Sequence, residues 1–201
     1  VIHPNYPVVD ALLNAHGRGA AVRVVLDSGD GQAASTNQAM DETFERLALA
    51  LGRDPAGTSF AVQCPRACIS KEPDSINHNK FVVMSQSGSI SDVVFQSTAN
   101  IRSDGSGDAA WNAATVTSAN PDLYASYTGY LRDLSVQLSV PDNDYNAYRP
   151  PTRYGFSTPY YFPRTDGTDS VSATLMSVDC SLAPTRVDVM ASFFTRPKVR
   201  N

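Results

Sequence analysis

Hydrophobic and polar residues follow two characteristic spacings along the first third of the chain. Apolar residues recur at helical spacing over residues 8–15, and the glycines of the following GRG turn close that helix. The β-branched run AAVRVVLD, residues 20–27, then predicts a short buried strand. Residues 35–52 repeat the helical pattern, and TSFAVQC, residues 58–64, predicts a second strand. A helix that leads into a strand through a glycine turn is the unit of an α/β sheet, which is the fold class we expect.

The middle of the chain predicts more strands and a further helix. Two apolar runs, 80–85 and 92–97, are joined by a Gly/Ser turn, which predicts a pair of adjacent strands. The segment DAAWNAATVTS predicts another strand. ANPDLYASYTGYLRDL is predicted to be a helix, because an asparagine, a proline and an aspartate stand in order at its start.

The last third of the chain starts a similar pattern again. Residues 139–157 are rich in Pro, Tyr, Asp and Asn without a period, which predicts a linker. A strand, a helix from about 170 to 178 and a strand at 186–194 are expected to follow. This helix-then-strand order repeats that of the first 27 residues. We therefore expect residues 1–138 to form one complete repeat and residues 158–201 to form the start of a second, incomplete repeat.

Composition and charge narrow the possible partners. The chain has 201 residues, 42% of them apolar and 18% charged, which is enough to bury a core. A formal net charge of −4 argues against broad electrostatic binding of nucleic acid, which normally shows as a basic surface. A local basic pocket is still compatible with that charge. No apolar run approaches the length of a membrane span.

Two of the three cysteines are closely spaced. Cys64 and Cys68 lie four residues apart around a proline, which suits a small disulfide loop in a secreted protein. The pair could instead be half of a zinc site, but no second Cys/His pair with ligand spacing follows. We therefore predict a disulfide and secretion, which the few lysines and many Ser, Thr, Asn, Asp and Tyr residues also fit. Any partner of Cys180 is expected outside these 201 residues.

A histidine and a lysine stand together at the start of a predicted strand, in SINHNKFVVMSQ, residues 75–86. Alternation along a strand sends residues i and i+2 to the same face, so His78 and Lys80 should point the same way, with Asn79 opposite. An imidazole and an ammonium held side by side repel when both are charged. They become useful together when an anion lies between them, so the pair indicates an anion site.

The next strand ends in FQSTAN and supplies two more polar groups. Antiparallel pairing would bring Ser97 and Asn100 near His78 and Lys80. Imidazole, ammonium, hydroxyl and amide around one point suit attack on a phosphodiester, with the histidine as nucleophile and the other groups holding the phosphoryl oxygens. No carboxylate-rich cluster lies nearby in the sequence, so we predict no metal site and no cofactor.

This set of residues resembles the HxK…GSxxN signature of the phospholipase D superfamily. The resemblance extends to ALLNAHGRGAAVRVVLD, to WNAATVTSANPDLYASYTGYLRDL, and to YYFPRTDGTDSVSATLMSVDCSLAPTRVDVMASFFT, which is similar to the entry into the second repeat of two-motif members. It implies a mixed sheet flanked by helices and a secreted bacterial phosphodiesterase that works through a phosphohistidine intermediate. His78 and Lys80 are then catalytic residues, with His78 as the nucleophile or as the acid partner of the nucleophile, and Ser97 and Asn100 bind phosphate.

The chain departs from the family pattern in three ways. Ser85 stands where the family usually has an aspartate, and Gln96 stands where it usually has a glycine. Family members also use two HxK motifs, one for the nucleophile and one for the acid that protonates the leaving group. We expect the second motif from further chain or from a homodimer partner, and the new helix-strand start favours further chain.

Three classes of function remain open after these observations. The first is a secreted phosphodiesterase that acts on phospholipid or nucleic acid, and the acidic composition favours phospholipid. The second is an inactive relative that binds phosphate without turnover. The third is a structural part of a larger protein whose site is completed elsewhere. Trp111 and Asn112 are candidates for the pocket wall, although Trp111 fits a core position equally well.

Overall fold

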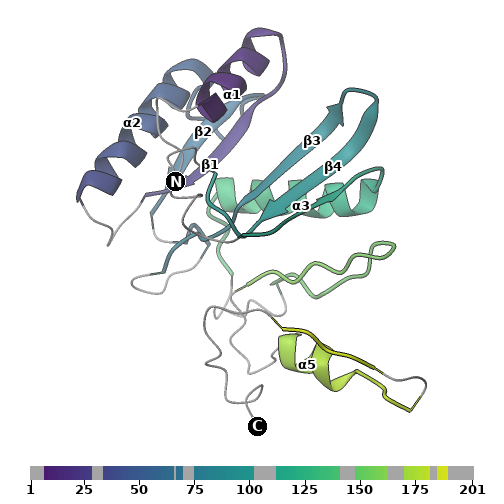
Figure 1. Ribbon diagram of the computed structural model, residues 1–201. Helices are drawn as coiled ribbons and strands as arrows, with labels where there is room; N and C mark the ends of the chain where they lie inside the picture. Colours follow the sequence, from purple (N-terminus) through teal and green to yellow (C-terminus); the bar gives the residue numbers. More distant parts are fainter. Residues whose placement is uncertain are drawn as a thin grey trace. The chain divides into compact units, whose positions relative to one another are not determined.

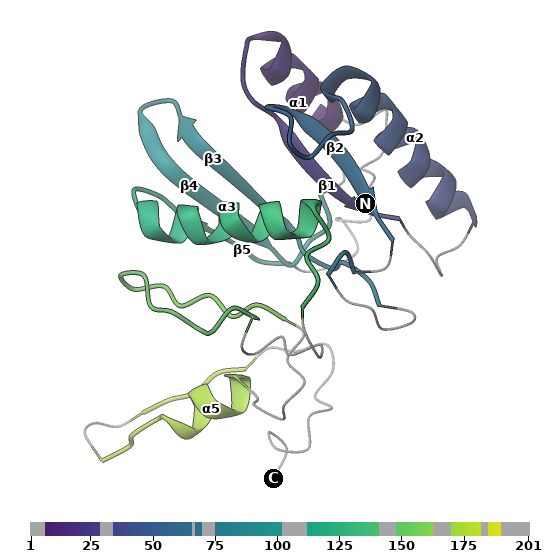
Figure 2. The same ribbon diagram turned by 180° about the vertical axis from the view of Figure 1, so that it is seen from behind.

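The computed structural model describes most of the chain, namely residues 7–28, 34–65, 67–69, 75–101, 112–140, 148–162, 170–181 and 185–189. These residues form a mixed α/β structure with two small sheets (Figures 1 and 2). The chain divides into two compact units, of which the first consists of Val1–Val140 with Tyr154–Ser157 and the second of Pro141–Arg153 with Thr158–Asn201.

The first sheet is a pair of parallel strands covered by two helices. Its elements are α1 (Pro7–Gly17), β1 (Arg23–Asp27), α2 (Ala34–Leu51) and β2 (Phe60–Cys64). Apolar residues of these elements, together with the residue before β1, meet in one buried cluster, which consists of Val9, Val22, Val24, Leu47, Ala48, Leu51 and Ala61. This arrangement confirms the α/β pattern expected from the alternation of helical and strand spacing.

The second sheet is antiparallel and has the strand order β3-β4-β5. Its strands are β3 (Phe81–Ser87), β4 (Ile90–Ser97) and β5 (Ala114–Thr117). Gly88 has a φ of 60° in the two-residue turn between β3 and β4, a conformation that glycine adopts without a steric penalty. The predicted adjacent strands are therefore confirmed as a hairpin.

Helix α3 (Pro121–Ser135) packs against the antiparallel sheet. The side chain of Asn120 caps it by accepting a hydrogen bond from the Leu123 amide at 3.1 Å, as its sequence predicts. Leu123 and Tyr127 pack on Val94 of β4 in a second buried cluster. Because α3 also contacts β1 and β2, it links the two sheets of the first unit.

The second unit contains α5 (Ser170–Met176), which confirms the helix expected near residues 170–178. The strand expected at 186–194 is not present over 185–189, and the rest of it lies outside the described residues. Residues 158–162 also form no strand, where one was expected after the linker. Among the described residues, no helix combines the length and apolar character needed to cross a membrane.

Candidate functional site

Lys80 is a buried cation immediately before β3. Its side chain is 9% exposed, and its Nζ makes no hydrogen bond to any described residue. Two hydroxyls, those of Ser28 and Thr128, share this lack of a partner, but Lys80 carries the only charge among these three groups. An ammonium held out of water without an acceptor is costly, so the site favours an anion that can provide one.

Desolvation also changes the acid–base behaviour of Lys80 and His78. Burial lowers the pKa of Lys80 below its ordinary value. The pKa of His78 is lowered as well, first by its own desolvation and then by the positive charge of Lys80. This effect reflects the proximity of the two groups, which are separated by one residue. His78 is exposed, and a pKa below the ordinary histidine value of 6.5 favours its neutral form near pH 7.

Ser97 lies directly opposite Lys80 across the hairpin. Its amide donates a 2.9 Å hydrogen bond to the Lys80 carbonyl, one position beyond the Phe81–Gln96 pair. Residues that face each other across two strands place their side chains on the same side of the sheet. The Ser97 hydroxyl accepts a 2.9 Å hydrogen bond from the Ala99 amide, so it is already engaged within its own loop.

The remaining candidates are Asn100, Asn112 and Trp111, and neither Asn100 nor Asn112 makes a hydrogen bond to the Lys80 ammonium. Asn100 is exposed and makes no hydrogen bond to His78 or Lys80 in the part of the chain that the structure describes. Asn112 is exposed beside β5, where its side-chain oxygen accepts a 3.0 Å hydrogen bond from the Thr98 hydroxyl. Trp111 lies outside the described residues.

The two single-residue departures from the expected motif, Ser85 and Gln96, occupy different environments. Gln96 lies on the face of the hairpin that α3 covers, where its side-chain oxygen accepts a hydrogen bond from the Tyr127 hydroxyl. Phe81 lies on the same face, with its ring 5.3 Å from that of Tyr127 and 5.9 Å from that of Tyr130. Gln96 therefore takes part in packing α3 on the sheet. Ser85, in β3, is exposed.

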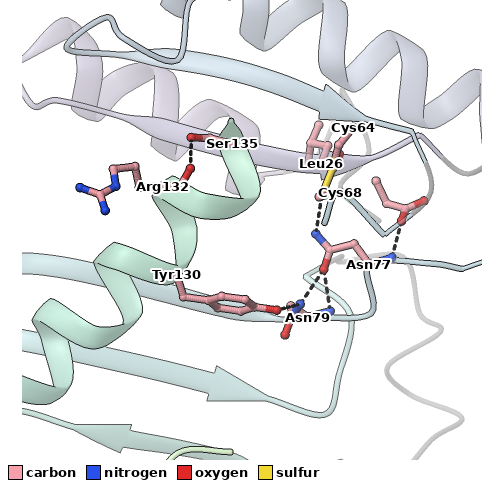
Figure 3. Close-up of a disulfide and its surroundings, with 9 residues drawn as sticks. Leu26, Cys64, Cys68, Asn77, Asn79, Tyr130, Arg132 and Ser135 are labelled. Atoms are coloured by element: carbon pink, nitrogen blue, oxygen red, sulfur yellow. Dashed lines mark hydrogen bonds between the residues drawn. A yellow bond between two sulfur atoms is a disulfide. The ribbon is translucent and has the colours of Figure 1, made fainter. Parts of the chain in front are cut away.

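The predicted disulfide is present at the end of β2. Cys64 and Cys68 are bonded, with Cα atoms 4.9 Å apart, and both side chains are buried (Figure 3). Cys180 is an exposed free thiol. In the described residues no three His, Cys, Asp or Glu side chains are grouped as metal ligands would be.

The sequence reasoning missed two residues that flank His78. Asn77 and Asn79 both make side-chain hydrogen bonds, which connect the His78 segment to the disulfide and to Tyr130 of α3 (Figure 3). The local signal was the repeated asparagine in INHNK, but their partners lie up to 51 residues away in sequence.

Comparison with known proteins gives no relative from which a role can be transferred. No family model, no curated protein and no solved structure matches the chain. The function must therefore be argued from the site itself.

Proposed function

We propose that this protein is a phosphodiesterase of the phospholipase D type. The observation that carries the proposal is the buried Nζ of Lys80, which lacks an acceptor among the described residues. Its positive charge also lowers the pKa of the neighbouring His78. A phosphodiester offers the anionic oxygens that such a group requires. The resemblance of the His78–Lys80 and Ser97–Asn100 spacing to the family signature supports the same chemistry.

In the proposed reaction the neutral imidazole of His78 attacks phosphorus. A P–N bond forms, the P–O bond to the leaving alkoxide breaks, and a separate acid protonates that alkoxide. Water then attacks the phosphohistidine and gives up a proton to the group that had served as the acid, the P–N bond breaks, and a phosphomonoester and neutral His78 are released. Lys80 stabilises the negative charge on the phosphoryl oxygens in both steps, and Ser97 and Asn100 assist it.

The proposal includes the family fold and the second HxK motif that supplies the acid. That motif would come from further chain or from a homodimer partner. A phospholipid fits the net charge of −4 better than nucleic acid, because this net charge disfavours the approach of a long polyanion. Secretion, inferred from the disulfide, would place the protein where extracellular lipid is accessible.

The experiment is a turnover assay with trapping of the intermediate. The substrates are phosphatidylcholine vesicles, bis(p-nitrophenyl) phosphate and a DNA oligonucleotide, each in the presence of EDTA. Each substrate is incubated with the 201-residue chain and, in parallel, with a form of the protein that carries two HxK motifs, either a longer chain or a homodimer. We expect release of the lipid headgroup and an alkali-stable, acid-labile phosphoprotein, both lost in His78→Ala. Turnover that persists in His78→Ala, or no turnover on any diester, would refute the proposal.

One observation favours a second candidate, a phosphate-binding module without turnover. The His78 imidazole makes no hydrogen bond to a described residue, whereas a nucleophilic or general-base histidine is normally oriented by a third group. Binding of dimethyl phosphate that requires Lys80, in a sample with no turnover under any of the conditions above, would identify this second function.

A further inference from the structure

His78 lies between two asparagines whose side chains fix the chain on both sides of it. The side-chain oxygen of Asn77 accepts hydrogen bonds from the amide and from the side-chain nitrogen of Asn79, at 3.3 and 2.7 Å. These two bonds from Asn79 to the side chain of Asn77 span His78, as in an Asx turn. The backbone of His78 is therefore enclosed in a local loop that Asn77 closes.

Asn77 is in turn attached to the first sheet by two further contacts. Its side-chain nitrogen lies 3.3 Å from Sγ of Cys68, and its backbone amide donates to the carboxylate of Asp27 at the end of β1. Figure 3 shows Asn77 directly below the disulfide, with its side chain directed at Cys68. One residue thus joins the disulfide loop, the end of β1 and the His78 segment.

Asn79 makes the matching attachment on the other side. Its side-chain nitrogen donates a 3.0 Å hydrogen bond to the hydroxyl of Tyr130. Tyr130 is a buried residue of α3, and its ring stacks on Phe81 at the start of β3. Asn77 therefore connects the segment that carries His78 to the disulfide loop and to the end of β1, and Asn79 connects it to α3.

The disulfide has a local purpose in this arrangement. It closes a loop of only a few residues, for which the stabilisation from reduced chain entropy is small. Cys68 has a φ of 66°, in the left-handed region that non-glycine residues adopt only rarely. The bond to buried Cys64 ties the Cys68 sulfur to the end of β2, where it lies 3.3 Å from the side-chain nitrogen of Asn77.

We propose that Asn77 is a positioning residue for His78 and that the Cys64–Cys68 disulfide holds Asn77 in place. The kinetic part of this inference rests on the proposed function, whereas the structural part does not. Without Asn77 or the disulfide, the backbone that carries the imidazole loses its fixed position relative to Lys80, which is anchored independently through Ser97. Anion binding by Lys80 is retained, and the attack by His78 is slowed.

The test compares four forms of the full chain: wild type, Asn77→Ala, Cys64→Ala with Cys68→Ala, and all three changes together. Cys180→Ala serves as the matched control, because it removes an exposed free cysteine. Backbone ¹⁵N relaxation of the His78 and Asn79 amides reports positioning without any substrate. We expect faster motion at both amides in all three variants and unchanged relaxation in Cys180→Ala.

Steady-state kinetics provide the second readout and use the form of the protein that carries two HxK motifs. A displaced nucleophile lowers kcat by on the order of 10²-fold with little change in KM, because misplacement by about 1 Å has effects of that size. If the disulfide acts through Asn77, the combined variant is no slower than Asn77→Ala alone, since the cysteine changes remove only the support of Asn77. Should Asn77→Ala fail to fold, Asn77→Ser and the cysteine pair variant provide the same two readouts.

Three outcomes decide the inference. Unchanged motion of His78 in Asn77→Ala and in the cysteine variant would overturn it, whether or not the protein is an enzyme. Effects that add fully in the combined variant would overturn the role of the disulfide. Increased motion in a chain with no diesterase turnover would support the positioning role and refute the proposed function instead.

Discussion

The Ser97 amide donates a hydrogen bond to the Lys80 carbonyl, so these two residues form the last backbone pair of the β3–β4 hairpin before the His78 segment. The pair fixes the backbone of Lys80 from the β4 side and leaves its side chain buried without an acceptor. The backbone of Lys80 is therefore held by the hairpin, and its side chain is in a state that a bound anion would stabilise. Preorganised charges of this kind are what oxyanion and phosphoryl stabilisation requires.

Replacing Lys80 by methionine should stabilise the protein and remove its anion site. An apolar side chain of similar length eliminates a buried, unpaired ammonium, and we expect a gain of about 1 kcal/mol in the free energy of unfolding. Urea denaturation measures that gain. Titration with dimethyl phosphate, followed by NMR, should show that binding is lost.

Arg18→Met is the matched control, because Arg18 is an exposed cation in the turn after α1. It removes the same charge and should leave both stability and dimethyl phosphate binding nearly unchanged. A Lys80→Met protein that is less stable than wild type would show that Lys80 has an acceptor in solution, and the anion site would lose its main support.

Ser97→Ala tests whether the hydroxyl serves the anion or only its own loop. Its present hydrogen bonds to the Ala99 amide and the Ala113 carbonyl predict a loss of about 1 kcal/mol in stability. If the hydroxyl also binds phosphoryl oxygen, the affinity for dimethyl phosphate should fall about fivefold to tenfold.

Thr98→Ala separates these two effects. The Thr98 hydroxyl donates to Asn112 and accepts from the Ala113 amide, so its removal should cost a similar amount of stability. It should not change the affinity for dimethyl phosphate. Equal affinities in Ser97→Ala and Thr98→Ala would restrict Ser97 to a structural role.

The helices and strands of the first unit could be predicted because their patterns are local. The hairpin illustrates the limit of that approach. Strands were expected at 80–85 and 92–97. In the structure β3 ends two residues later, at Ser87, and β4 begins two residues earlier, at Ile90. Backbone hydrogen bonds extend the ladder to the two-residue turn even where the side chains are polar and exposed, so apolar spacing underestimates strand length.

The site was predictable in part, for the same physical reason. The pairing of Lys80 with Ser97 followed from two adjacent strands, which need only a short turn. The contacts of Asn77 with Asp27 and of Asn79 with Tyr130 join residues 50 and 51 positions apart. Such contacts depend on how the two sheets and α3 assemble, which no local spacing records. The burial of Lys80 is a consequence of the same assembly.

The core around α2 offers a direct measurement of packing with two identical substitutions. Leu47 is fully buried, whereas Leu49, two residues later in the same helix, is 91% exposed. Leu47→Ala should lower the free energy of unfolding by about 3 kcal/mol, and Leu49→Ala should change it by less than about 0.5 kcal/mol. Similar losses in urea denaturation would mean that α2 does not pack as described.

The pH dependence of anion binding should have two limbs. Dimethyl phosphate is suitable because it stays a monoanion throughout the range. Its affinity requires protonated Lys80, whose pKa is lowered by burial, so binding should weaken as pH rises through a midpoint below the ordinary lysine value of about 10.4. The pKa of His78 is also lowered, so its added charge should strengthen binding only at a pH below the ordinary histidine value of about 6.5.

Two variants assign the two limbs of this profile. Lys80→Met should remove the alkaline limb together with most of the affinity. His78→Gln should remove the acidic limb and keep the alkaline one, because its amide cannot be protonated in this range. An alkaline midpoint at or above about 10.4 in the wild-type protein would show that Lys80 is solvated. The buried, unpaired ammonium on which the proposed chemistry depends would then not exist in solution.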